Sequence, residues 1–164
     1  MILSFITLEY LKTNSGKKGE GMPVFRNPQY YFKEGFCWTD VNSTYLKARI
    51  KKNGVFDLLS MSMFTKLNIP DWYFVCMINS KLISLYVDNF VNNTSHFQIN
   101  YARQLPIVIP TKVQLEKFEY FFNTAFKMEK LEFENELSKS EVIQKLTELQ
   151  EDIDETVAIL YDLV

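Results

Sequence analysis

The last third of this chain contains no residue that breaks a helix. All five glycines lie at or before position 54, and no proline follows Pro110. Two sequence motifs typical of helix starts, called capping boxes, are formed by Thr111 with Gln114 and by Ser138 with Glu141. This pattern predicts two helices over residues 111–164, with a break near 137–140.

Apolar residues recur at helical spacing in both predicted helices. In the first helix they are Val113, Phe118, Phe121, Phe122, Ala125 and Met128, and in the second they are Val142, Leu146, Leu149, Ile153, Val157 and Leu160. The second set has the spacing of a coiled coil. Two helices joined by a short break form an antiparallel hairpin. Its apolar stripe needs a partner, for which the candidates are the other helix, the front of the chain and another chain.

The front part, residues 1–110, alternates short stretches of β-forming residues with turns. We predict strands over 4–11 and 30–32, a tight turn and a strand within 33–40, and a buried strand or strand–turn over 55–64, and the Asn53-Gly54 pair predicts a hairpin turn. A helix with Phe74, Ile78, Leu82 and Leu85 on one face should follow. It is predicted to end at 92–95, before a strand over 96–100 in which polar and apolar residues alternate.

These elements predict an α+β fold with two parts. Residues 1–110 should form a small mixed or antiparallel sheet with packed helices, and residues 111–164 a C-terminal antiparallel helical hairpin. Charge divides at the same place, because residues 1–110 carry 12 Lys and Arg against 7 Asp and Glu, whereas residues 111–164 carry 6 against 13. This asymmetry favours a polyanion as the partner of the front part.

Several classes of protein are disfavoured. The two cysteines, Cys37 and Cys76, and the one histidine, His96, do not have the spacing of a zinc site, so we interpret the cysteines as buried thiols in a reducing compartment. The first residues lack the basic start of a signal peptide, and charged residues interrupt the apolar helix too often for a membrane span. We therefore expect a cytoplasmic protein without a metal or a membrane.

Two segments resemble chemical motifs without completing them. The loop over 12–21 holds three glycines and Lys17-Lys18, which suits either a solvated turn or contacts to phosphate, but it lacks the Gly-Lys-Ser/Thr ending of a nucleotide-binding loop. Asn27-Pro28-Gln29-Tyr30 is similar to the catalytic Asn-Pro-Pro-Tyr of adenine methyltransferases. Because no cofactor-binding sheet precedes it, we expect a turn there instead.

Six segments in the same order resemble one family. They are FKEGFCW at 32–38, VFDLLSMSMF at 55–64, INSK at 78–81, NNTSHFQIN at 92–100, ARQLPI at 102–107 and IDETVAILYDL at 153–163. Together they are similar to the target-recognition domain of site-specific adenine DNA methyltransferases, in single-chain type IIG enzymes and in the specificity subunits of type I systems. Ser60 and Asp162 depart from the pattern, because the family usually has Gly at both positions.

The resemblance implies a DNA-recognition module that is not an enzyme on its own. Its implied partners are double-stranded DNA, a methyltransferase catalytic domain in the same or a neighbouring chain, and a second copy bound through the hairpin. S-adenosylmethionine would belong to the catalytic domain, so no cofactor is expected in this chain. Two alternatives are a protein–protein module that docks through the hairpin and an independent methyltransferase that uses the segment 27–30.

The residues expected to contact DNA follow from the chemistry of the duplex, in which Arg and Lys suit guanine and phosphate and Asn and Gln suit adenine. For phosphates we predict Lys17, Lys18, Arg49, Lys51 and Lys52, and for bases Arg26, Lys33, Asn93, His96, Gln98 and Arg103. Gln98 also has an interpretation as a structural hydrogen-bonding group that closes a turn, and His96 as an ordinary surface or core histidine. No catalytic residue is predicted.

Overall fold

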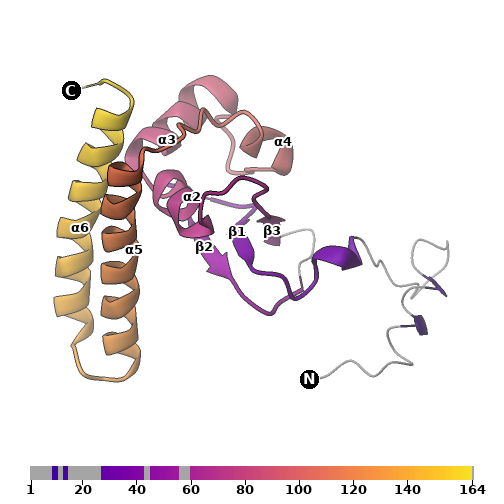
Figure 1. Ribbon diagram of the computed structural model, residues 1–164, viewed down its shortest axis with the longest axis horizontal. Helices are drawn as coiled ribbons and strands as arrows, with labels where there is room; N and C mark the ends of the chain where they lie inside the picture. Colours follow the sequence, from indigo (N-terminus) through magenta and orange to yellow (C-terminus); the bar gives the residue numbers. More distant parts are fainter. Residues whose placement is uncertain (1–8, 11–12, 15–26, 43–44, 56–59, 164) are drawn as a thin grey trace.

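The computed structural model describes residues 9–10, 13–14, 27–42, 45–55 and 60–163 (Figure 1). The strand predicted over 4–11 and the loop predicted over 12–21 lie outside this range apart from 9–10 and 13–14, and so do Lys17, Lys18 and Arg26. We call the described part of 27–110 the front body and the described part of 111–163 the hairpin.

A three-stranded antiparallel sheet forms one layer of the front body. Its order is β2 (Ala48–Lys51), β1 (Gly35–Thr39), β3 (Ser60–Met63), so β1 lies in the middle. Phe36 and Trp38 of β1 are 1% and 0% exposed and face the helix α2 (Asp71–Ile78), where the rings of Phe36 and Phe74 stack with centroids 5.5 Å apart. Cys37, which points to the opposite face, is buried as well, so the middle of β1 is covered on both faces.

Gly35 begins β1 at a point where a side chain has no room. A Cβ atom there would lie 2.6 Å from the carbonyl oxygen of Met63 and 2.8 Å from the ring of Phe64. The close approach of β3 to β1 thus depends on glycine at this position.

The long helix predicted around Phe74–Leu85 is two helices, which is a correction to the sequence prediction. α2 ends at Ile78 and α3 (Lys81–Tyr86) begins after a bend of 62°. The Ser80 hydroxyl is fully buried, donates to the carbonyl of Met77 and accepts from the amide of Ile83, so it caps the new helix. The break also leaves Leu85 46% exposed instead of buried on the predicted face.

After the bend, α3 continues into a short π-helix, η2 (Val87–Val91). The strand predicted over 96–100 is wrong, because only His96 pairs, in a single antiparallel bridge with Val41, and Ile99–Ala102 form a short helix, α4. The alternation at 96–100 reflects instead one deeply buried side chain, Phe97, which is 2% exposed.

Two further local predictions, a strand over 30–32 and a hairpin at Asn53-Gly54, are wrong. Residues 30–32 form no strand, because Pro28–Tyr30 make a 3₁₀ turn, η1, and Phe32 has a φ of 64°. Asn53 has a φ of 50°, as its turn signal predicts, but the turn does not join paired strands, since β2 and β3 both pair with β1.

The predicted hairpin is confirmed, although the connection between its helices lies at 134–138, a few residues earlier than the predicted break near 137–140. α5 (Lys112–Phe133) and α6 (Lys139–Leu160) run antiparallel, and both predicted capping boxes are formed, at Thr111–Gln114 and Ser138–Glu141. Both helices end on a residue with left-handed φ, Asn135 at 59° and Asp162 at 54°, which is the conformation that glycine often supplies at a helix end.

One half of the hairpin packs on the front body and the other half does not. Phe118, Leu149 and Val157 belong to the same hydrophobic cluster as Phe36 and Trp38. Toward the connection between the helices, by contrast, Phe126 is 65% and Phe133 is 88% exposed. Figure 1 shows the loop end of the hairpin extending past the sheet. The observed α+β architecture, with a small antiparallel sheet, packed helices and a C-terminal helical hairpin, confirms the predicted fold class.

No single helix among the described residues has the length and apolar character needed to span a membrane. The bent pair 71–78 and 81–91 meets the length and composition criteria together. Tyr73 to Ile78 are nevertheless buried inside the protein, as expected of a core helix.

Candidate nucleic-acid interface

The surface of the front body is cationic. Seven basic side chains are exposed against two carboxylates, Glu34 and Asp88; the basic residues are Lys33, Lys47, Arg49, Lys52, Lys66, Lys81 and Arg103. Folding increases this excess, because Asp40 is 7% exposed and Asp71 is partly buried. Burial also raises the pKa of Asp71, which disfavours its charged form.

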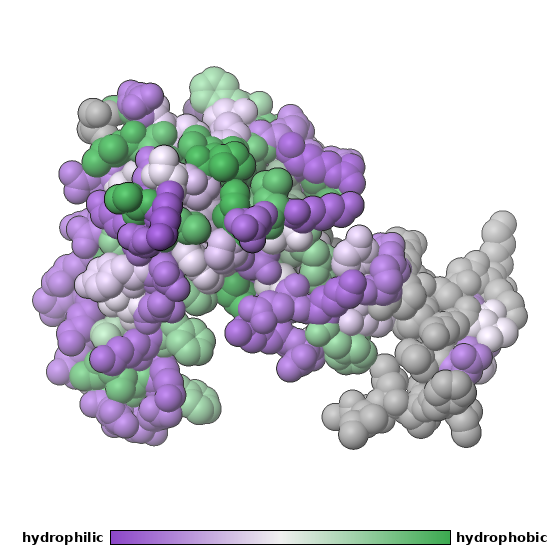
Figure 2. All heavy atoms as spheres, in the orientation of Figure 1, coloured by the Kyte–Doolittle hydropathy of each residue, from purple (hydrophilic) through white to green (hydrophobic). Residues whose placement is uncertain are grey.

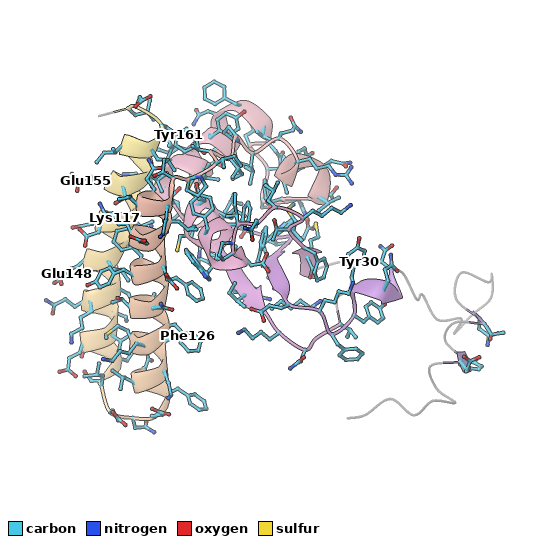
Figure 3. All side chains as sticks on the ribbon, in the orientation of Figure 1. Tyr30, Lys117, Phe126, Glu148, Glu155 and Tyr161 are labelled. Atoms are coloured by element: carbon cyan, nitrogen blue, oxygen red, sulfur yellow. The ribbon has the colours of Figure 1, made fainter. Side chains whose placement is uncertain are left out.

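A groove of about 1020 Å³ lies between the front body and α5. Apolar side chains from both sides line it, including Ile50, Trp72, Phe122 and Phe126. Figure 3 shows Phe126 projecting from α5 on the side of the sheet, and Figure 2 shows apolar side chains on the same side of the distal hairpin. The charged groups at this groove are Glu34, Arg49, Lys52, Asp71 and Glu129.

Three predicted phosphate contacts lie on or just after β2, and the structure separates them. Arg49 and Lys52 are exposed beside the groove, and the Lys52 ammonium lies 3.5 Å from a Glu34 carboxylate oxygen. Lys51 is only 8% exposed, with its ammonium 5.7 Å from the centroid of the Phe64 ring, and burial lowers its pKa. Because a buried ammonium cannot reach a phosphate, we exclude Lys51 from the residues that could contact DNA.

The segment that resembles a catalytic motif lies near the same end of the sheet. Tyr30 stacks on Phe64 with centroids 4.8 Å apart, and the Lys33 ammonium lies 5.4 Å from the centroid of the Tyr30 ring. In a methyltransferase the corresponding ring must be open to stack on a flipped base. Here the Tyr30 ring already has two intramolecular partners, which favours a structural role for it.

His96 and Asn93 belong to a loop that is hydrogen-bonded to Asp40, just after the C-terminal end of β1. The His96 Nδ1 atom lies 2.7 Å from Oδ2 of Asp40, the residue that follows β1. The Phe97 amide donates to the Asp40 carbonyl, and the Trp38 indole N–H donates to the Phe97 carbonyl. Asn93 is exposed. The side-chain amide of its neighbour Asn92 donates a hydrogen bond to the backbone carbonyl of His96.

Gln98 and Arg103 flank the short helix α4. Gln98 occupies the N-cap position, but its side chain makes no capping hydrogen bond and is exposed. The structural interpretation of Gln98 is therefore not supported at this turn. Arg103 follows the last turn of α4 and is exposed.

Most candidate contacts near the sheet lie at one of the two ends of β1, whereas Arg49 pairs with Cys37 in the middle of the strand. Lys33 and Lys52 lie near Gly35, which pairs with Lys51, whereas the His96 loop lies beyond Thr39. Four steps of extended strand, from Gly35 to Thr39, separate these ends by about 13 Å. The residues predicted to contact DNA therefore do not meet in one pocket but lie along β1 and in the loop that follows it.

A polar junction that the sequence analysis did not identify fixes the hairpin to the front body. The Asn79 side chain accepts from the Ala48 amide at 2.6 Å and donates to its carbonyl at 3.0 Å, so it pairs with the outer edge of β2. Gln150 of α6 donates to the Asn79 carbonyl. Asp154 accepts from the Lys81 amide at 2.7 Å and from Gln150 at 3.1 Å.

The chemical groups needed for metal or thiol chemistry are not assembled in the described part of the chain. No cluster of three or more His, Cys, Asp and Glu side chains there could hold a metal ion. Cys37 and Cys76 are both buried free thiols, as predicted. Burial raises the pKa of Cys76 to about 12, so this thiol stays protonated and unreactive.

Comparison with known proteins does not assign a family. No model of a known protein family matches the chain, and no curated protein matches it significantly.

Proposed function

We propose that this chain is the DNA sequence-recognition module of a restriction–modification, adenine-specific DNA methyltransferase. It would position duplex DNA for a catalytic domain that this chain does not contain. The observation that carries the proposal is the cationic surface of the front body, with seven exposed basic side chains against two carboxylates. Such a surface suits the phosphate backbone, which supplies most of the affinity for DNA.

The separation of the two contact groups supports the same proposal. A major groove is about 12 Å wide, so a protein that reads it needs base contacts flanked by phosphate contacts at a comparable distance. Lys52 near one end of β1 and Arg49 opposite Cys37 in its middle suit phosphates, and the polar loop at the other end suits bases. Base contacts determine sequence preference, whereas phosphate contacts determine position.

A salt titration with a short duplex of mixed sequence tests the proposal. We expect binding that weakens steeply as salt rises, and a double substitution of Arg49→Glu with Lys52→Glu that weakens binding to all duplexes alike. Removing one phosphate contact should reduce the slope of log affinity against log salt by about 0.9. Absence of binding to any duplex at low salt would reject the proposal.

A matched control uses the hairpin. Lys127 and Lys139 are exposed on α5 and α6, so Lys127→Glu with Lys139→Glu changes the net charge by the same amount. If both double variants weaken binding equally, the effect is one of total charge and the front body has no special role.

Methyl transfer is proposed to belong to the separate catalytic domain, which would bind S-adenosylmethionine. The packed ring of Tyr30 supports this division. Calorimetric titration of this chain with S-adenosylmethionine should give no binding heat, and saturable binding would instead favour an independent methyltransferase.

The alternative is an assembly module that self-associates through the hairpin. The specific observation in its favour is the exposed aromatic stripe on the distal part of α5, where Phe122 stacks on Phe126 and Phe133 is 88% exposed. Light scattering should then show a dimer that Phe126→Ser with Phe133→Ser converts to a monomer. A monomeric wild-type protein at all concentrations would reject this alternative.

A further inference from the structure

The contact between Asp40 and His96 joins a buried carboxylate to an exposed imidazole. The Asp40 side chain is 9% exposed and the His96 side chain 55%. The two residues are 56 positions apart in sequence, and the 2.7 Å distance between Oδ2 and Nδ1 is that of a good hydrogen bond. The pair therefore fixes one side of the imidazole ring and leaves the other side at the surface.

This arrangement is unfavourable for the stability of the fold. The second carboxylate oxygen of Asp40 is buried, and it has no hydrogen-bond partner among the residues that the structure describes. Burying a carboxylate with only one partner destabilises a protein, and an apolar residue is often more favourable for stability alone. Stability alone therefore does not account for a carboxylate at this position, directly behind an exposed imidazole.

The backbone around the ring is fixed by several independent contacts. Val41 and His96 form an antiparallel bridge, and the Asn42 amide donates to the Ser95 carbonyl at 2.8 Å. The Asn92 side chain accepts hydrogen bonds from the amide and the hydroxyl of Thr94. The imidazole is thus held by its backbone as well as by Asp40.

The carboxylate also determines which nitrogen carries the proton. A carboxylate accepts hydrogen bonds only, so the neutral ring must place its proton on Nδ1. The outer nitrogen, Nε2, is then a hydrogen-bond acceptor. In the major groove the exocyclic amino groups of adenine and cytosine are donors, and an acceptor at the protein surface matches them.

We propose that His96 reads one base pair in the major groove, by accepting a hydrogen bond at Nε2 from the amino group of adenine or cytosine. Asp40 is the positioning residue, which holds the ring and its tautomer without touching DNA. This inference rests on the proposed function and deepens it, because it names the chemical group that the loop at the end of β1 recognises.

Selection from a library of random duplexes tests the proposal. The wild-type protein should enrich a motif, and His96→Ala should lose the preference for adenine or cytosine at one position by roughly 2- to 13-fold, as expected for one hydrogen bond, while keeping the other positions. Asn100→Ala is a matched control, since Asn100 is an exposed polar residue on α4, and it should select the wild-type motif.

Asp40→Asn gives a readout that a purely structural role would not produce. The amide can donate to Nδ1, which places the ring proton on Nε2 and turns the outer nitrogen into a donor. The preference at the same position should then move toward guanine or thymine, which present acceptors. If this buried variant does not fold, as judged by circular dichroism, the exposed variants His96→Ala and His96→Gln still decide the question.

The outcomes separate the inference from the proposed function. If the wild-type protein binds no duplex, the proposed function fails. If the wild type selects a motif and His96→Ala and His96→Gln select the same motif, the inference is overturned and the function stands. If His96→Ala weakens binding to every duplex equally, the histidine contacts phosphate and the inference is again overturned.

Discussion

The front body and the hairpin carry opposite charge at their surfaces. In the hairpin eleven carboxylates are exposed against six lysines; the acidic residues are Glu116, Glu119, Glu129, Glu134, Glu136, Glu141, Glu148, Glu151, Asp152, Glu155 and Asp162. In Figure 3 Glu148 and Glu155 project from α6 away from the front body. The hairpin would repel a polyanion where the front body would attract it, so DNA would approach from the side of the front body.

The two parts also differ in what defines their local structure. Each helix of the hairpin begins with a capping box and ends on a left-handed residue, so its limits are set by side chains within three or four positions. The elements of the front body end where distant residues contact them, as Asn79 does with Ala48. Yet both parts contribute to one hydrophobic cluster, through Phe118 from the hairpin and Trp38 from the sheet.

Removing Phe118 should have the largest effect, because it would break the connection between the two parts. Phe118 is fully buried and meets Tyr73 edge to face, with centroids 5.1 Å apart. Phe118→Ala should lower the free energy of unfolding by about 3–5 kcal/mol, measured by urea denaturation. Phe126→Ala on the same helix is the control, and it should change stability by less than about 0.5 kcal/mol because Phe126 is exposed. Equal effects of the two substitutions would contradict a shared core.

Removing the Asn79 side chain should have an intermediate effect. Asn79→Ala leaves the amide and carbonyl of Ala48 without their partners at the edge of β2. We expect a loss of about 1–3 kcal/mol in the free energy of unfolding. Hydrogen exchange should also show faster exchange of the Ala48 amide. Unchanged exchange there would mean that the side chain does not protect the edge.

The pH dependence should be the smallest effect and should have opposite signs in the two parts. Hydrogen bonds from the Ser138 hydroxyl and amide lower the pKa of Glu141, whereas burial raises the pKa of Asp71. A lowered folded-state pKa gives stability that is present above the usual range of a glutamate and lost as the pH falls. A raised folded-state pKa gives stability that is present below the usual range of an aspartate and lost as the pH rises.

Two variants measure these signs. Glu141→Gln should be less stable than wild type at neutral pH, and the difference should disappear in acid. Asp71→Asn should gain stability relative to wild type as the pH rises from acid to neutral. The stability of each variant relative to wild type is measured by thermal unfolding across this pH range. If the stability difference changes with pH in the same direction for both variants, the two carboxylates do not have opposite environments.

The comparison also explains which predictions from the sequence succeeded. The hairpin was predicted with its break and both capping boxes, because helix periodicity and caps depend on residues three and four apart. The strand predicted over 96–100 was wrong, because its polar residues alternate around Phe97, whose burial depends on Trp38 and β1. Arg49 and Lys51 have the same charge and share a face of β2, but Lys51 is buried, with its ammonium beside the Phe64 ring, thirteen residues along the chain.

The sequence by itself determined the helical hairpin and the division of charge between the two parts, since both follow from composition and from short-range spacing. Tertiary structure alone decided that the Asn79 side chain pairs with β2, that Lys51 is buried, and that Asp40 lies behind His96. The physical reason is that each of these depends on groups far apart in the chain, whose contact is set by how the sheet, the bent helices and the hairpin share one core.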